Sequence, residues 1–106
     1  VSEMNKEITV ENIKELVADY FKIPLDKLQG KTRKREVVIA RQLSMYLAKN
    51  HTTNSLKNIG DQFGGRDHST VIYSCKTVQD LMETDLILKD TVSELEKKIR
   101  LSLNDK

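Results

Sequence analysis

The sequence is poor in residues that cross-link, kink or anchor a chain, because its 106 residues include one cysteine, one proline and no tryptophan. Cys75 has no second cysteine for an internal disulfide and no partner at zinc-ligand spacing, so nothing indicates an oxidising compartment or a structural metal. No stretch approaches the roughly 18 consecutive apolar residues of a membrane span, and the opening VSEMNKEITV lacks the apolar region of a signal peptide. These absences favour a cytoplasmic protein.

The length of the chain suits one domain, because about 100 residues bury a single hydrophobic core but not two. The sequence opens on Val1, and only 38% of its residues are hydrophobic. We therefore expect an excised piece of a larger protein, although a processed terminus would look the same. Residues 1–8 are interpreted as the remnant of a linker and residues 9–106 as the domain.

The charge is divided unevenly along the chain. The formal net charge is only +2, but the segment from Lys31 to Lys76 carries nine Lys and Arg against three Asp and Glu, which leaves it at +6 and the rest near −4. Such a division predicts one electropositive face and one solubilising face. A polyanion is the expected partner.

The first third of the chain predicts a helix and a short turn. Thr9 is the expected N-cap, with Ile8 and Ile13 as a hydrophobic staple. The apolar face of this helix has spacings of three and four: Ile13, Leu16, Val17 and Tyr20. The helix ends at Ile23-Pro24, because the residue before proline is pushed out of the helical region, and residues 25–28 make one further turn.

A longer helix is predicted from Glu36 to about Lys49, directly after the dense basic run KTRKR at 31–35. Its buried face is marked by Ala40, Leu43 and Leu47. Eight residues advance a helix by about 80° net, so the side chains of Arg41, Gln42 and Lys49 fall within an arc of roughly 100°. Three donors are therefore expected to point the same way.

Residues 55–78 read as a short helix, a tight glycine turn and a second helix. Ser55 is the expected cap, Gly64-Gly65 the break, and the second helix begins near Asp67 and His68. Its apolar stripe is Val71, Cys75, Val78 and Met82. A last amphipathic helix follows Thr84-Asp85, and no segment alternates with period two. We therefore predict an all-α compact bundle of about five to six helices with no sheet.

A helix, a glycine turn and a helix with polar residues in its first turn are typical of a helix-turn-helix, here at about 55–82, whose second helix enters the major groove end-on. His68, Ser69 and Thr70 offer hydrogen-bonding groups, and Asp67 can accept from a cytosine amino group. Plainer interpretations stand beside these. Asp67 also suits an N-cap, His68 a surface histidine, and the glycine pair an ordinary helix end.

The stretch IGDQFGGRDHSTV closely resembles the signature of the C-terminal DNA-binding domain of the bacterial DnaA replication-initiator family. The resemblance extends upstream through ARQLSMYLAK at 40–49, the basic loop at 30–35 and ITVENIKELVADYFKI, and so covers nearly the whole chain. It implies a Trp-repressor-like helix-turn-helix that binds short asymmetric boxes of the TTATCCACA kind at a replication origin as a monomer. The recognition helix would lie in the major groove and the basic loop in the adjacent minor groove.

The resemblance also implies roles for individual residues. Base contacts are expected from the loop and the start of the second motif helix: Arg33, Asp67, His68, Ser69 and Thr70. Phosphate contacts are expected from Arg41, Gln42, Lys49, Leu56 and Lys57. ATP binding in this family belongs to an upstream domain, so no cofactor is expected here, and the implied location is the bacterial nucleoid in the cytoplasm.

Three departures from the family pattern bear on this transfer. Ser69 stands where many members have threonine, Lys57 replaces a common proline, and Ile39-Ala40 replaces an Arg-Pro pair. The loss of a methyl at Ser69 weakens a contact with a thymine methyl. We still expect the same box, with altered affinity at most.

Other classes of function fit the sequence less well. Asp67, His68 and Ser69 are the residue types of a hydrolytic triad, but consecutive residues on a helix diverge by about 100°, so no enzyme is predicted. The stretch GDQFGGR lacks the lysine and hydroxyl of a phosphate-binding loop. A transcriptional regulator of similar topology, and a basic module that binds acidic phospholipids through KTRKR, remain the alternatives.

Overall fold

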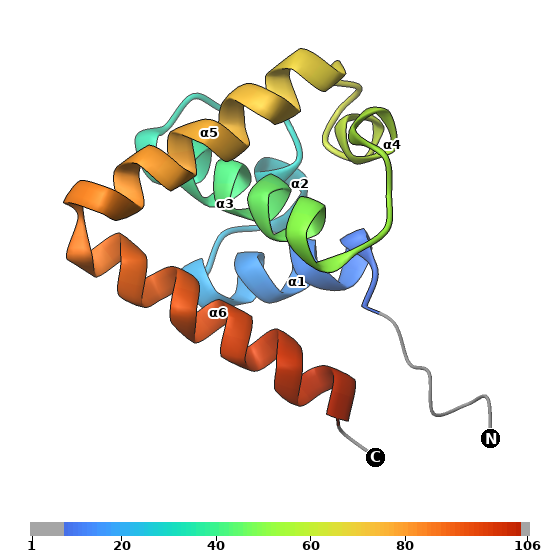
Figure 1. Cartoon of the computed structure of the whole chain (residues 1–106). Helices are drawn as coiled ribbons and strands as arrows, with labels where there is room; N and C mark the ends of the chain where they lie inside the picture. The colour runs from blue at the N-terminus through green and yellow to red at the C-terminus, as the bar shows by residue number, and fades with distance from the viewer. Residues whose placement is uncertain (1–7, 105–106) are drawn as a thin grey trace, which may run out of the picture.

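The computed structural model describes residues 8–104, with side chains as far as Leu101, and within this range it contains helices and no strand (Figure 1). The elements are α1 (Val10–Phe21), α2 (Leu25–Leu28), α3 (Arg35–His51), α4 (Leu56–Asp61), α5 (His68–Thr84) and α6 (Leu86–Asn104). The predicted all-α bundle is confirmed. Of the predicted linker remnant at 1–8, only Ile8 lies inside the described residues, and it is buried.

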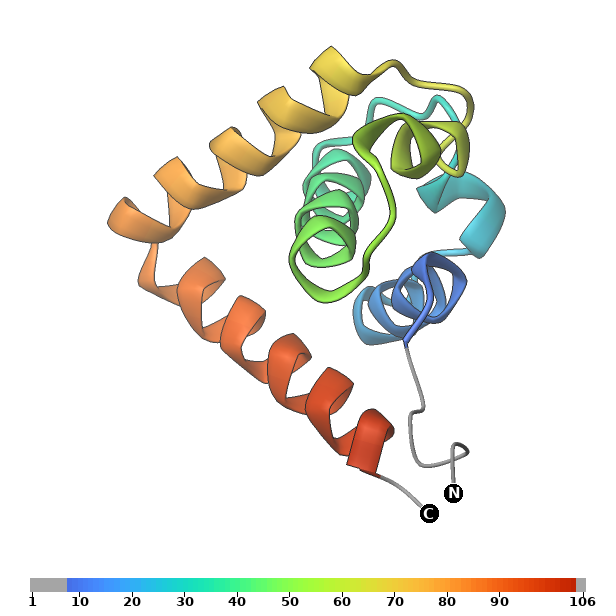
Figure 2. The ribbon, with the colours of Figure 1, turned by 45° about the vertical axis from the view of Figure 1, so that its right-hand side comes forward.

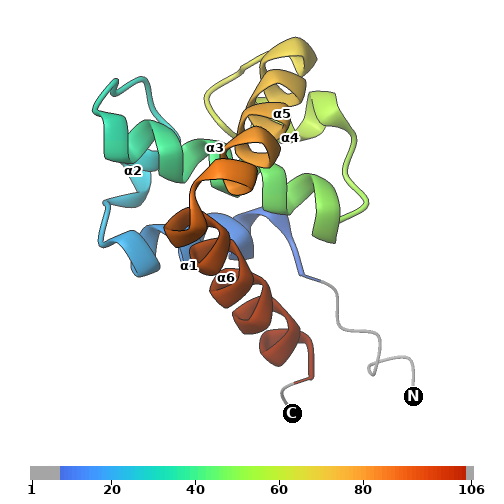
Figure 3. The same cartoon turned by 60° about the vertical axis from the view of Figure 1, so that its left-hand side comes forward.

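Helix α3 forms the centre of the bundle and packs against α1, α2, α4 and α5. Figure 2 shows α5 and α6 meeting at a sharp corner, so that the two longest exposed helices wrap around α3 and α1 from one side. With the left-hand side of Figure 1 turned forward, α6 runs away from this corner across α1 (Figure 3), with which it is in contact. None of the described helices is long and apolar enough to cross a membrane.

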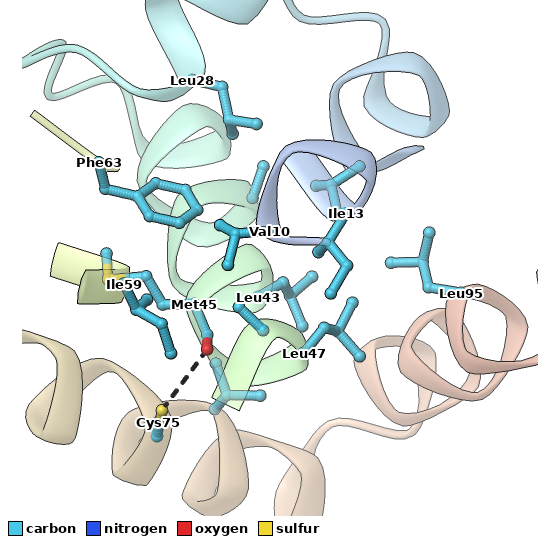
Figure 4. Packing of buried hydrophobic residues seen from close by; sticks show 14 of the residues in the cluster. Val10, Ile13, Leu28, Leu43, Met45, Leu47, Ile59, Phe63, Cys75 and Leu95 are labelled. Carbon is cyan, nitrogen blue, oxygen red and sulfur yellow. Dashed lines mark hydrogen bonds between the residues drawn. The ribbon is translucent and has the colours of Figure 1, made fainter. Parts of the chain in front are cut away.

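The core is a single cluster to which every helix contributes (Figure 4). The predicted buried face of α3 is confirmed, because Ala40, Leu43 and Leu47 have no exposed surface. On α5 the predicted stripe is buried as far as Val78, whereas Met82 is only half-buried. Phe63, the largest fully buried side chain, brings the end of the short α4 into the same core.

The ends of α1 follow from local chemistry. The hydroxyl of Thr9 accepts from the amide of Asn12 at 3.0 Å, and the Asn12 side chain accepts from the Thr9 amide at 3.3 Å, which is a reciprocal capping box. Ile8 and Ile13 are both buried around this cap, as the predicted staple requires. The helix ends at Lys22, whose φ of 57° is left-handed, and Pro24 then opens α2.

Lys14 is buried in the middle of the bundle, which the sequence analysis did not foresee. Its ammonium donates to Oε1 of Gln29 at 2.7 Å and to the carbonyl of Gln62 at 2.9 Å, and lies 5.5 Å from the ring centroid of Phe63. These contacts tie α1 to the segment after α2 and to the end of α4. Lys14 thus fixes the positions of two segments that lead into the basic loop and into the glycine turn.

Candidate nucleic-acid interface

The helix-turn-helix is formed by α4, α5 and the glycine turn between them. The hydroxyl of Ser55 accepts from the amide of Asn58 at 3.1 Å and so caps α4 as predicted. Gly64 and Gly65 have φ of 85° and 77°, a region that glycine adopts without the steric penalty of a side chain. The chain therefore reverses within a few residues and leads directly into α5.

Asp67 is the N-cap of α5. Its Oδ1 accepts from the backbone amide and from the hydroxyl of Thr70, both at 3.0 Å. These hydrogen bonds favour the ionised form, so they lower the pKa of the Asp67 carboxyl from its ordinary value. The N-cap interpretation is confirmed, and the second oxygen of the carboxylate lies at an exposed helix start.

The first turns of α5 present a polar face to solvent. His68, Ser69, Tyr73 and Lys76 are exposed, while Thr70 is half-buried beside its cap. Tyr73 is 66% exposed, so its ring lies on the surface and not against the core. These side chains are accessible to a macromolecule that approaches the N-terminal half of α5.

The basic loop links α2 to α3 and carries exposed cations at Lys31, Arg33 and Lys34. Arg35, which the sequence analysis placed in the loop, is the first residue of α3 and is also exposed. Figure 2 shows the loop passing next to the turn between α4 and α5. The two segments enclose a hollow of about 320 Å³ between Arg33, Arg66 and the glycine pair.

Arg41 does not lie on an exposed face with Gln42 and Lys49, contrary to the helical projection. Its side chain is only 5% exposed, and Nε donates to the carbonyl of Leu28 at 2.7 Å. Its Nη2 donates to the carbonyls of Lys27 and Thr32, each at 3.1 Å. The last carbonyls of a helix lack intrahelical partners, and here the guanidinium donates to two of them; the Lys27 carbonyl also accepts from the amide of Gly30 at 3.3 Å. Burial, followed by the charge of Arg66, lowers the pKa of Arg41.

Arg66 is a residue of the site that the sequence analysis missed. Its Nη2 donates to the carbonyl of Gly30 at 2.9 Å, and its Nη1 donates to the carbonyl of Phe63. Partial burial lowers the pKa of Arg66. The contact with Gly30 joins residues 36 positions apart, so no local pattern predicts it. The one signal in the sequence is that Arg66 directly follows the glycine pair.

The remaining predicted phosphate contacts are spread over α3 and α4. Lys49 and Lys57 are exposed, while Gln42 and Leu56 are half-buried. Lys57 lies 3.4 Å from a carboxylate oxygen of Asp61 in an exposed pair of the i,i+4 type. Such a pair contributes little to stability, so Lys57 can exchange it for another anion.

The electrostatics of this face are one-sided. Among residues 8–101, Lys14 pairs with Glu11 and Lys57 with Asp61, and a hydrogen bond joins His51 to Glu96. None of these pairs neutralises a cation of the basic loop or of α5. The same part of the chain also contains no cluster of three side chains suited to hold a metal ion. The arrangement therefore offers unpaired cations and hydrogen-bond donors to a polyanion.

Comparisons with known proteins agree with the geometry. The sequence model described as the bacterial dnaA protein helix-turn-helix matches residues 10–78. Three similar relatives are named chromosomal replication initiator protein DnaA. The chain is 48% identical to the one from Flavobacterium psychrophilum over 95% of its length, 45% identical to that from Laribacter hongkongensis over 91%, and 43% identical to that from Gloeothece citriformis over 91%.

The chain spans about a fifth of the length of these relatives, namely 21%, 20% and 21%. The matched part contains the whole of α1 to α4 and most of α5, and so includes the basic loop, α3, α4 and the start of α5, which form the candidate interface. A helix-turn-helix module of this kind is not an enzyme, in agreement with the prediction from the sequence. The chain belongs to the helix-turn-helix family of bacterial DnaA proteins.

Proposed function

We propose that this domain binds double-stranded DNA in a sequence-specific manner, at boxes of the TTATCCACA kind, and that it thereby supports initiation of bacterial chromosome replication. In this proposal the start of α5 enters the major groove, where His68, Ser69, Thr70 and the cap residue Asp67 meet base edges. Arg33 of the basic loop enters the adjacent minor groove. The domain acts as a monomer on an asymmetric site.

The observation that carries the proposal is the position of the basic loop beside the turn that leads into α5, with Arg66 and Gly30 in contact at 2.9 Å. Adjacent major and minor grooves are separated by one phosphate backbone. Two reading elements that lie side by side can therefore occupy both grooves at once. The cations around them are the groups that DNA phosphates attract.

Six exposed cations besides Arg33 lie between residues 31 and 76: Lys31, Lys34, Arg35, Lys49, Lys57 and Lys76. If about five or six phosphates are neutralised, log K should fall against log salt with a slope of about −5. Arg41 is left out of this set because its guanidinium is occupied by backbone carbonyls. A slope near zero would refute the electrostatic part of the proposal.

The decisive experiment is fluorescence anisotropy of the domain with a duplex that carries TTATCCACA and with a scrambled duplex, at about 150 mM salt. His68→Ala and Lys49→Gln are the matched variants, since both positions are exposed. His68→Ala should remove mainly the preference for the box, at about 1 to 3 kcal/mol for a good base contact. Lys49→Gln should weaken both duplexes alike.

Equal binding of both duplexes by the wild-type domain would overturn the box assignment, and preference for a different sequence would indicate a transcriptional regulator. Binding to vesicles of acidic phospholipid, without binding to either duplex, would indicate the lipid alternative. That alternative has less support, because the exposed large apolar side chains lie on other segments: Tyr20, Ile72, Tyr73, Leu86, Ile87 and Leu101. No such side chain lies in the basic loop.

A further inference from the structure

We propose that Arg41 and Arg66 are positioning residues, which hold the basic loop against the helix-turn-helix so that Arg33 and the start of α5 meet DNA as one rigid unit. This inference rests on the proposed DNA-binding function and goes beyond it. It assigns the two arginines to the protein's own backbone and not to DNA phosphates.

Arg41 holds the end of α2 and the middle of the loop. Its donors reach two carbonyls at the end of α2 and one at Thr32, the residue before Arg33. With three hydrogen bonds and 5% exposure, the side chain has little surface left for a phosphate. Arg41 itself lies on α3 and next to its buried face, so the loop is fixed to the centre of the bundle.

Arg66 holds the loop from the other side. One end of its guanidinium donates to Gly30 in the loop and the other to Phe63 in the turn before α5, so a single side chain bridges the two segments. The backbones also approach closely here, because a Cβ atom on Gly64 would lie 2.9 Å from the carbonyl oxygen of Gln29. The loop and the turn are thus packed together and not merely neighbours.

Arginine suits this task better than lysine. A guanidinium is planar and donates in several fixed directions, so it can bridge separate carbonyls, whereas an ammonium acts as a compact point charge. The two guanidinium groups lie close enough for the charge of Arg66 to disfavour that of Arg41. Hydrogen bonds from the two guanidinium groups to five backbone carbonyls offset this repulsion.

A loop that is already ordered in the unbound protein binds DNA more tightly than a mobile loop, because it loses little conformational freedom on binding. Immobilising flexible segments on binding costs free energy that otherwise appears as affinity. Loss of the bridge should therefore reduce the contribution of Arg33 to box binding without removing Arg33. The dependence of the Arg33 contribution on Arg66 can be measured as a coupling free energy between the two residues.

The test is a double-mutant cycle between Arg66→Gln and Arg33→Ala, measured by anisotropy on the box and scrambled duplexes. In the wild-type background Arg33→Ala should weaken box binding about tenfold, and in the Arg66→Gln background less than about twofold. The matched control is Lys76→Gln, an exposed cation of α5 without a carbonyl partner in the loop, which should leave the effect of Arg33→Ala at about tenfold.

Two further readouts separate positioning from a phosphate contact. Arg66→Gln should leave the salt slope on the scrambled duplex unchanged, whereas loss of a phosphate contact would make it shallower by about 0.9. Arg66→Lys keeps the charge but not the bridge, so the coupling to Arg33 should stay lost. Backbone amide relaxation of the free variants should show residues 30–34 more mobile than in the wild type, while circular dichroism confirms that the helices persist.

Additive effects of Arg66→Gln and Arg33→Ala, a shallower salt slope, or recovery of the coupling by Arg66→Lys would each overturn the inference. These results differ from failure of the proposed function. That failure appears in the wild-type domain as equal binding of both duplexes, whereas an additive cycle with intact box preference refutes only the positioning role.

Discussion

The glycine pair before α5 allows a sharp test, because its two members share a backbone conformation but not an environment. Both have left-handed φ, at 85° for Gly64 and 77° for Gly65. A Cβ atom at Gly64 would lie 2.9 Å from the carbonyl oxygen of Gln29 and 3.2 Å from Nη1 of Arg66, whereas one at Gly65 meets nothing within 4 Å. Gly64→Ala and Gly65→Ala therefore differ only in crowding.

The magnitudes follow from this difference. A left-handed alanine costs about 1 to 2 kcal/mol in either variant. Alanine also restricts the unfolded chain equally at both positions, so that effect cancels in the comparison. The backbone carbonyl cannot swing away as a side chain does, so Gly64→Ala should cost about 1 to 3 kcal/mol more than Gly65→Ala. The crowding also pushes the basic loop away from the turn, and box affinity should fall in Gly64→Ala alone.

Urea unfolding followed by circular dichroism measures the free energy of unfolding of both variants. With a slope of about 1.5 kcal/mol/M, a difference of about 2 kcal/mol separates their midpoints by about 1.3 M. Anisotropy on the box duplex measures the second effect. Equal midpoints together with equal box affinities would show that the loop and the turn are not in close contact, and would refute the reasoning.

Three further predictions concern the supports of the site. Hydrogen bonds from Thr70 lower the pKa of Asp67. The contribution of Asp67 to stability is therefore present above the ordinary value of 3.8 and is lost as pH falls through the lower pKa of the folded state. The thermal unfolding midpoints of Asp67→Ala and wild type should thus differ near neutral pH and become equal in acid. Leu95→Ala removes a fully buried side chain of α6 and should cost about 2 to 5 kcal/mol in urea unfolding, with box affinity unchanged because α6 lies outside the interface. Lys14→Met leaves two acceptors without their donor and should lower the free energy of unfolding by about 1 to 3 kcal/mol, a loss that neutral behaviour in calorimetry would contradict.

Local patterns in the sequence predict most of the fold. The caps at Thr9, Ser55 and Asp67 and the break at Gly64-Gly65 depend on neighbouring residues, and all four are present in the structure. The all-helical class follows equally from spacing. The exposed face at the start of α5 is local in the same sense, because consecutive turns of one helix determine it.

What the sequence did not reveal depends on contacts between distant segments. A helical projection gives the direction of the Cβ atom of Arg41 but not the reach of its side chain, which turns back to the end of α2. The partner of Arg66 lies 36 residues away. Lys14 did leave a signal, because it falls between Val10, Ile13 and Val17 on the apolar face of α1 and so had to be buried or to interrupt that face.

The hydrogen-bond partners of Arg41 and Arg66 also determine how the domain responds to its ionic surroundings. Both side chains are held by carbonyl dipoles, and among residues 8–101 neither forms an ion pair. Dissolved salt screens attraction between exposed charges far more than it weakens partly buried hydrogen bonds. Raising the ionic strength should therefore weaken the proposed attraction between the exposed cations and DNA phosphates, while the shape of the binding surface persists. In the binding mode proposed above, a rise in ionic strength would release the domain from DNA with its binding surface already formed.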